Sequence, residues 1–276
     1  MRLNLLDKLD AIMGDLDSES PETSSDLELA VSLRSQLETA NEELYEFAHA
    51  EIALRGSSSA LNQWLTELAG NRGSERPHPG LSFNLLDEIV TGVLQLRGPC
   101  DPGFLLSTEM TAYQPTPARH ILDLISACAF STRDVLVDLG SGLGHVPLLV
   151  NILAGISTFG VEVQPHYAAG AEETARRLNL SHVQFTAEDA RTTDLSRGTV
   201  FYMFTPFTGS ILTAVLERLH QLSTKRPIRV CALGPCTRIL QQQNWLAPSR
   251  PSDTERVAVF TSLPTSDHDR RQPKRQ

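Results

Sequence analysis

From residue 134 onward, short apolar segments alternate with stretches of helical length, and this alternation limits the chain to a few folds. In chain order the apolar segments read DVLVDL, STFGVEV, HVQFTA, TVFYMF, IRVCALG and RVAVFTS. They are rich in β-branched and aromatic residues, as strands are, and we expect a helix between each pair of the first five. Such units form a Rossmann-like α/β fold, a mostly parallel sheet with helices on both faces. The last strand, 255–262, follows a connection that contains proline and could be antiparallel.

The residues before 134 show helical rather than strand-like spacing of their apolar side chains. The expected helices cover 3–16, 26–54, 62–69, 82–96 and 117–129. The stretch 70–80 is rich in Gly, Pro and charge and is typical of a linker, and prolines and glycines make 98–117 irregular. The predicted organisation is a helical region at 1–75, a linker with a connecting helix at 76–109, a ligand-binding α/β domain at 110–265 and a disordered basic tail at 266–276.

The net charge of −9 is unevenly distributed along the chain. Residues 1–75 hold 15 Asp/Glu and 5 Lys/Arg, whereas the remainder holds 18 and 19. An acidic helical region argues against nucleic acid as its partner, and we expect it to cover the mouth of the site or to form a homodimer. No apolar run approaches the roughly 20 residues of a membrane span, and no secretory signal is present. We therefore expect a cytoplasmic protein with no membrane partner.

A glycine-rich turn follows the first strand of the alternating region, where the chain reads VDLGSGLGHV. Gly140, Gly142 and Gly144 come directly after Asp138 and lead into a helix that begins at about His145. In open α/β sheets, ligands bind beyond the carboxyl ends of the strands, where glycine permits close approach to the backbone. A dinucleotide-binding GxGxxG turn would place glycine at position 145, so a nicotinamide oxidoreductase is disfavoured. An acid before the first glycine suits a ligand with an ammonium group or hydroxyls, which points to S-adenosylmethionine.

Two further acidic positions follow the next two strands. Glu162 ends the second strand, where a carboxylate can accept hydrogen bonds from both hydroxyls of a ribose. Glu188 and Asp189 follow the third strand, where a carboxylate can accept from the amino group of adenine. Acids after three successive strands are a more specific signal for a nucleoside ligand than the glycines alone.

On these residues the chain resembles the class I, seven-stranded S-adenosylmethionine-dependent methyltransferases. The resemblance covers roughly residues 110–262, with DLGSGLG as the family's first motif, Glu162 as its acid after strand two, and Asp189 with Ala190 after strand three. It implies a seven-stranded sheet and S-adenosylmethionine as cofactor. The candidate cofactor-binding residues are Tyr113, Thr116, Asp138, Gly140, Ser141, Gly142, Gly144, His145, Glu162, Val163, Glu188, Asp189, Ala190 and Phe204.

A narrower resemblance links the chain to the histone-lysine methyltransferases that use this fold instead of a SET domain. It rests on YQPT at 113–116, on DLGSGLGHV and on the following GVE. In those enzymes a Tyr-x-x-Thr loop closes over the methionyl end, and Tyr113 and Thr116 stand at the matching places. A polar side chain follows their third glycine, and His145 takes that place here. Their basic nucleosome-contacting extension has no counterpart in the acidic N-terminal region, so the histone substrate is not carried over.

The segment YMFTPF, 202–207, ends the fourth strand, and the resemblance places it beside the methyl group. Nucleic-acid amine methylases have Asn/Asp-Pro-Pro-Tyr/Phe here, and Thr205 replaces the Asn or Asp, which argues against nucleic acid as acceptor. Phe204 and Phe207 form either an apolar, cation-attracting wall or core packing. His145 either acts as a base or orients the cofactor, or only caps its helix. Thr205, Phe207, His145 and Tyr113 are the candidate catalytic residues.

The sequence thus predicts a methyltransferase that transfers a methyl group by in-line displacement to an unidentified acceptor, either a protein side chain or a small molecule. The alternative is a catalytically silent module that binds S-adenosylmethionine and uses its helices to bind a partner. No metal site is expected, because the four cysteines show no CxxC pair and no histidine at ligand spacing.

Overall fold

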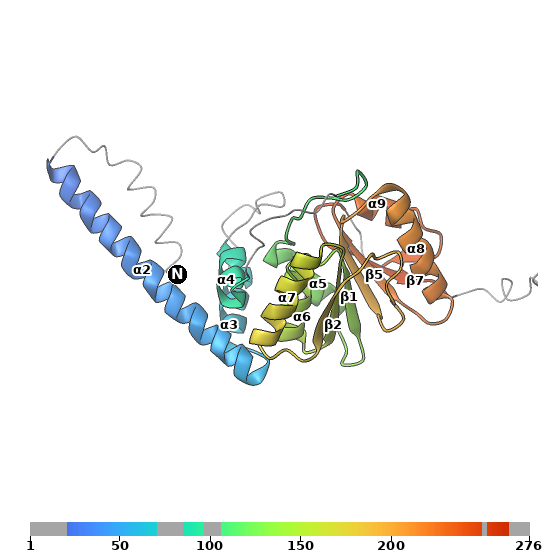
Figure 1. Ribbon diagram of the computed structural model, residues 1–276, viewed down its shortest axis with the longest axis horizontal. Helices are drawn as coiled ribbons and strands as arrows, with labels where there is room; N and C mark the ends of the chain where they lie inside the picture. The colour runs from blue at the N-terminus through green and yellow to red at the C-terminus, as the bar shows by residue number, and fades with distance from the viewer. Residues whose placement is uncertain (1–20, 71–84, 97–105, 250–252, 265–276) are drawn as a thin grey trace, which may run out of the picture.

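A computed structural model describes residues 21–70, 85–96, 106–249 and 253–264. Its centre is a seven-stranded sheet with the strand order β3-β2-β1-β4-β5-β7-β6 (Figure 1). The strands are β1 Val135–Leu139, β2 Ser157–Glu162, β3 Val183–Ala187, β4 Val200–Phe204, β5 Arg229–Leu233, β6 Leu246–Pro248 and β7 Ala258–Ser262. Strands β1 to β5 pair in parallel, whereas β7 runs antiparallel to both of its neighbours. The predicted fold class is confirmed, and so is the antiparallel last strand.

The register of the sheet brings the carboxyl ends of the strands to one edge. In the β1–β2 pair Leu139 lies opposite Val161, and in the β2–β3 pair Glu162 lies opposite Ala187. On the other side of β1, Asp138 lies opposite Tyr202 of β4. Because the central strands end almost level, the loops that follow them meet above the same edge.

Side chains that alternate along the strands separate two apolar layers. On one face Leu136, Val200 and Tyr202 are buried against α5 Ala118–Cys128, α6 His145–Ala154 and α7 Pro165–Arg177. On the opposite face Val137, Phe201 and Met203 pack with α8 Gly209–Ser223 and α9 Cys236–Gln241. Figure 1 shows these two groups of helices on either side of the sheet. The result is an α/β/α sandwich, as the strand-and-helix alternation predicts.

The prediction of a helix in every gap between the first five strands is wrong for the gap between β3 and β4. Residues 188–199 form turns instead of a helix. The carbonyl oxygen of Asp189 accepts hydrogen bonds from the amides of Thr192 and Thr193, and the Arg218 guanidinium donates to the Ala190 carbonyl at 2.7 Å. A long-range arginine therefore satisfies backbone carbonyls that a helix would satisfy internally. The short strand β6 was also not among the segments singled out in the sequence.

The N-terminal helices, α2 Pro21–Arg55, α3 Ser59–Gly70 and α4 Leu85–Leu94, share one continuous apolar core with the sheet. The ring of Tyr45 in α2 lies directly over Gly92 of α4, where an added Cβ would come within 2.4 Å of the ring. Asp87 of α4 accepts a hydrogen bond from the amide of Ala118, the first residue of α5. The predicted boundaries at 75 and 265, the helix at 3–16 and the tail at 266–276 lie outside the described residues.

Three cysteines, Cys128, Cys231 and Cys236, are buried and form no disulfide, and Cys100 lies outside the described residues. Within the described residues, no helix is long and apolar enough to cross a membrane. The same residues contain no cluster of three or more His, Cys, Asp or Glu side chains that could hold a metal ion.

The contact between Asp87 and the first turn of α5 should be measurable in the stability of the fold. Asp87→Ala removes the acceptor for the Ala118 amide and should lower the free energy of unfolding by about 1–2 kcal/mol. Asp87→Asn keeps an oxygen acceptor and should lose less. Thermal melting followed by circular dichroism compares the two, and equal melting temperatures for Asp87→Ala and the parent chain would contradict the assignment.

Candidate functional site

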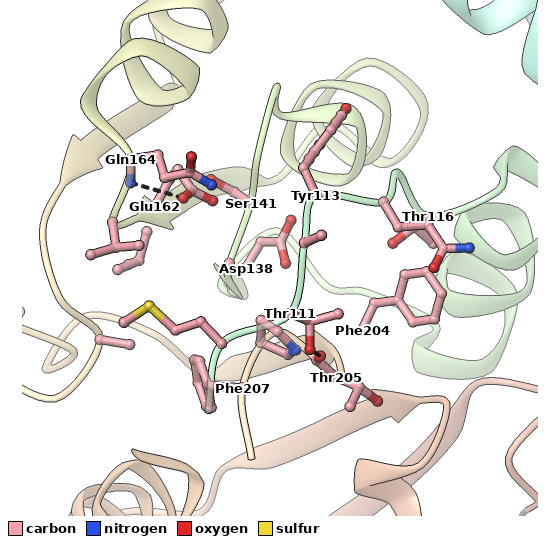
Figure 2. A pocket seen from close by; sticks show the side chains of 18 of the residues that line it. Thr111, Tyr113, Thr116, Asp138, Ser141, Glu162, Gln164, Phe204, Thr205 and Phe207 are labelled. Carbon is pink, nitrogen blue, oxygen red and sulfur yellow. Dashed lines mark hydrogen bonds between the residues drawn. The ribbon is translucent and has the colours of Figure 1, made fainter. Parts of the chain in front are cut away.

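A cavity of about 360 Å³ opens at the carboxyl edge of the sheet (Figure 2). Its walls come from the ends of β1 to β4, from the loop 106–116 that precedes α5, and from the first residues after β5. This volume lies within the range of small-molecule sites. The sheet register explains the position, because each parallel strand delivers its following loop to the same edge.

The glycine turn after β1 is held against β2 and approached closely by two other segments. The amides of Gly140 and Ser141 both donate to the carbonyl of Val161, at 2.8 and 3.1 Å. Gly140 has a φ of +85°, and a Cβ there would come within 2.3 Å of Pro206. Gly142 has a φ of +52°, and a Cβ there would come within 2.2 Å of the ring of Tyr113. Both positions therefore require glycine for backbone conformation and for space.

Two buried carboxylates, those of Asp138 and Glu162, face the cavity. Oε2 of Glu162 accepts from the amide of Gly142 and Oε1 from the amide of Gln164, each at 2.9 Å. Each oxygen keeps a lone pair for a further donor. Burial nevertheless raises the pKa of Glu162 above its usual range, and the backbone amides of Gln164, Gly142 and Val163 oppose this shift.

The carboxylate of Asp138 accepts no hydrogen bond from the described residues, and it points into the cavity (Figure 2). Its burial and the nearby Glu162 raise its pKa well above the usual range. Ser141 lies beside the pair with its buried hydroxyl also unpartnered within the described residues. Polar groups left in this state are those that a bound cation or donor would satisfy.

The acid after β3 is engaged by a neighbour. The Asp189 carboxylate pairs with the Arg191 guanidinium at 2.6 Å, and hydrogen bonds from Arg191 lower its pKa. Glu188, Ala190 and Val163 line the cavity next to it. An adenine amino group at this position would share the Asp189 carboxylate with Arg191.

The loop before α5 is fastened to the segment after β4 by backbone pairing. The amide of Thr111 donates to the Pro206 carbonyl at 3.0 Å, and the Thr111 hydroxyl donates to the Thr205 carbonyl at 2.8 Å (Figure 2). Met110 and Phe207 form an isolated antiparallel bridge. These contacts fix the wall of the cavity that lies next to the glycine turn.

Glu109 extends this fastening to the start of α8. Its carboxylate accepts hydrogen bonds from the amides of Ser210 and Ile211, at 3.0 and 3.2 Å, and from the Ser210 hydroxyl at 2.6 Å. The hydrogen bonds from Ser210 lower the pKa of Glu109. A side chain distant in sequence thus caps the N-terminus of α8, which favours negative charge.

Tyr113 and His145 close the cavity above the glycine turn. The Tyr113 hydroxyl lies 3.4 Å from Nδ1 of His145, and its ring stacks on Tyr167 with centroids 4.7 Å apart. Burial lowers the pKa of His145 to about 4, so the imidazole is neutral at pH 7 and weakly basic. The hydroxyl of Thr116, further along the loop, lies 3.1 Å from that of Tyr202.

Thr205 uses its side chain to hold the end of β4 rather than to face the cavity freely. Its hydroxyl donates to the Leu233 carbonyl at 3.0 Å and accepts from the Cys236 amide at 3.2 Å. Its φ of +40° is strained for a β-branched residue, and these bonds help to maintain it. Phe204 is half-buried and Phe207 buried, and both line the cavity.

The structure brings the predicted site residues together at this cavity, with two exceptions. Gly142 and Gly144 do not line it and instead shape the turn beneath it. Sequence reasoning missed Thr111, Gln164, Ile211 and Pro235, which also line the cavity. Gln164 was detectable as the second residue after the acid that ends β2. Thr111 lies in a segment expected to be irregular, and Ile211 and Pro235 reach the cavity only through the packing of the loops.

The Asp138 carboxylate, which accepts no hydrogen bond, should lower the stability of the folded chain at neutral pH. Its folded-state pKa lies above the unfolded one, so the folded chain binds more protons and stability falls as pH rises through this window. Asp138→Asn should therefore raise the melting temperature at pH 7.5, by roughly 2–4 °C for each kcal/mol gained in the free energy of unfolding. Near pH 4 the Asp138 carboxyl of the parent chain is protonated in the folded state, so the difference should disappear.

Asp134, at the start of the same strand, provides a control of opposite sign. Burial opposes its ionisation, but hydrogen bonds from Ser131, Thr199 and Arg229 lower its pKa to about 2. Asp134→Asn should lower the melting temperature at pH 7.5, with a smaller effect as pH falls toward 2. Destabilisation of the ligand-free chain by Asp138→Asn at pH 7.5 would contradict the account of the cavity.

Comparisons with known proteins gave one family match and several matches to solved structures. Residues 108–202 match the family described as histone methylation protein DOT1. Among solved structures, an RNA methyltransferase from Salinibacter ruber in complex with S-adenosyl-L-homocysteine is 22% identical, with a TM-score of 0.43, and the match covers 59% of this chain and 98% of that one. A SAM-dependent methyltransferase from Aquifex aeolicus is 15% identical, with a TM-score of 0.42 and coverage of 52% and 89%. No curated protein sequence matches the chain.

The chain has a seven-stranded, mostly parallel α/β fold, and its residues 108–202 are similar to the family described as histone methylation protein DOT1.

Proposed function

We propose that this chain transfers a methyl group from S-adenosylmethionine to a side chain of an acceptor protein. The observation that carries the proposal is the buried, unpartnered carboxylate of Asp138, which faces the cavity at the end of β1. A carboxylate kept in this state is stabilised by a cationic ligand, and an ammonium group supplies both the charge and the hydrogen bonds. A protein acceptor is supported by the similarity to a family described as acting on histones.

The residues around the cavity fit the parts of this cofactor. Asp138, with the unpartnered Ser141 hydroxyl beside it, would hold the methionyl end under Tyr113. Glu162 would accept from the ribose hydroxyls with the lone pairs that its backbone donors leave free. Glu188, Asp189 and Ala190 would bound the adenine. Val163 and Gly140 complete the walls.

S-adenosylmethionine, when bound, supplies a methyl group on a sulfonium that is already a good leaving group. The chain's task is therefore to orient the acceptor and to exclude water. Phe204 and Phe207 provide apolar walls beside the strand-four segment, and Phe204 offers a ring face to a cationic side chain. Tyr113 and His145 close the opposite side and are held by each other.

His145 is proposed to orient Tyr113 rather than to take a proton from the acceptor. Its pKa of about 4 leaves little driving force for proton abstraction at neutral pH. An amine acceptor would then lose its proton to solvent before entering the cavity. The predicted cytoplasmic location and the identity of the acceptor stay predictions.

Titration calorimetry with S-adenosylmethionine tests the cofactor site. The chain should bind it with micromolar affinity and should not bind NAD, and Asp138→Asn should weaken binding by about 1–3 kcal/mol. Binding should release protons and weaken as pH falls, because the ligand favours the ionised form of a carboxyl whose pKa is raised. Asp194→Asn, an exposed acid outside the cavity, is the control. Unchanged affinity in Asp138→Asn would refute the assignment.

Formation of S-adenosylhomocysteine distinguishes an enzyme from a silent binding module. We expect turnover with an acceptor protein mixture, such as purified core histones, and none with the chain alone. Thr205→Val removes the bonds to Leu233 and Cys236, so it should lower the free energy of unfolding by about 1–2 kcal/mol while sparing turnover at low temperature. A large loss of turnover with unchanged stability would instead restore Thr205 as a catalytic residue. Binding of cofactor without turnover on any acceptor would favour the silent module.

A further inference from the structure

A long stripe of exposed apolar side chains runs along α2. Leu54 is 79% exposed, Leu29 60% and Phe47 57%, and Leu33 and Leu44 are exposed as well. At 100° per residue, these five side chains fall within an arc of about 80° on the helix and span roughly 38 Å of its length. Single exposed apolar residues are ordinary, but several on one face of a helix indicate an interaction surface.

The stripe is separate from the face by which α2 packs on its own chain. Ala48 and Ile52 are buried, and Nδ1 of His49 lies 2.9 Å from the Val93 carbonyl. Asn179 donates to the carbonyl of Ala53 at 2.9 Å. These anchoring contacts all lie near the C-terminal end of α2, and Figure 1 shows the rest of the helix extending away from the sheet. The fold therefore presents the stripe on a helix fixed at one end.

Acidic residues outnumber basic ones on α2, and two of them border the stripe. The helix holds eight Asp/Glu and two Arg. Asp26 and Glu43 border the stripe, Glu28 and Glu46 lie further around the helix, and all four are exposed. A second copy of the chain would bring acid against acid along the contact, which disfavours the homodimer expected from the sequence. Phosphate-rich partners, nucleic acids and anionic lipid surfaces, are repelled for the same reason.

We propose that this surface docks a basic amphipathic helix of another protein, with apolar side chains on the stripe and Lys or Arg against the bordering acids. Charge complementarity selects this occupant, since a basic helix supplies both the apolar area and the opposite charge. Docking of this kind needs neither cofactor nor turnover, so it stands apart from the proposed methyltransferase activity. The apolar contacts supply affinity, and the acids supply steering and discrimination.

Fluorescence anisotropy with the full-length chain and a labelled helical peptide tests the proposal. The probe carries leucines at helical spacing flanked by lysines, and a matched peptide carries glutamates in place of the lysines. We expect saturable binding of the basic peptide that weakens as salt rises, and none of the acidic one. Leu33→Ser with Phe47→Ser should reduce affinity at least about tenfold. Val31→Ser, exposed on the opposite side of α2, should leave it unchanged.

Charge reversal gives a second matched pair. Asp26→Lys with Glu43→Lys should reduce affinity by about tenfold or more, whereas Glu38→Lys with Glu42→Lys, on the far side, should have little effect. Melting curves and cofactor binding confirm that the variants stay folded. Equal binding of both peptides, or binding unaffected by the stripe variants, would overturn the proposal. So would sedimentation showing a dimer that Leu33→Ser with Phe47→Ser converts to a monomer, because the occupant would then be a second copy.

Discussion

The hydrogen bonds that join the glycine turn to the end of β2 are the contact on which the site depends. Gly140 and Ser141 donate to the Val161 carbonyl, and Gly142 donates to the Glu162 carboxylate. Together they fix the turn after β1 against the end of β2, and they bring Asp138 and Glu162 close enough for the Glu162 charge to help raise the pKa of Asp138. The fold tolerates this repulsion because its core is built elsewhere, in the two layers between sheet and helices. The energetic cost is concentrated where a cationic ligand would relieve it.

The sequence was informative where structure follows from neighbouring residues. The apolar segments predicted six of the seven strands, and the acids after β1, β2 and β3 predicted a cavity that all of them line. These signals are local, because a strand, its terminal acid and its glycine turn lie within ten residues of one another. Contacts made between distant segments were invisible to this reasoning. Arg218 donates to a backbone carbonyl after β3, in a segment where a helix was expected. Glu109 caps α8 although the two are about one hundred residues apart in the sequence.

Thr205 is another residue whose contacts with distant segments could not be predicted from the sequence. Its position beside the expected methyl group suggested chemistry, but the chain uses its hydroxyl to join the end of β4 to Leu233 and Cys236. No pattern in the sequence announces a positive φ at a threonine, since that strain exists only once β4, β5 and the loop from Thr111 have come together. The shape of the cavity beside the end of β4 therefore depends on these bonds, which the sequence alone did not reveal.

The acidic helix α2 and the cavity are connected through a short series of packed elements. Tyr45 of α2 lies on Gly92 of α4, Asp87 of α4 caps α5, and α5 follows directly on the loop that carries Tyr113 and Thr116. Each step is a close contact, so α2 is held in a defined position relative to the mouth of the site. The excess of negative charge lies on this projecting part of the chain, whereas the domain that carries the cavity is close to neutral. A helix placed in this way gives the chain a means of choosing partners by charge without placing that charge inside the site.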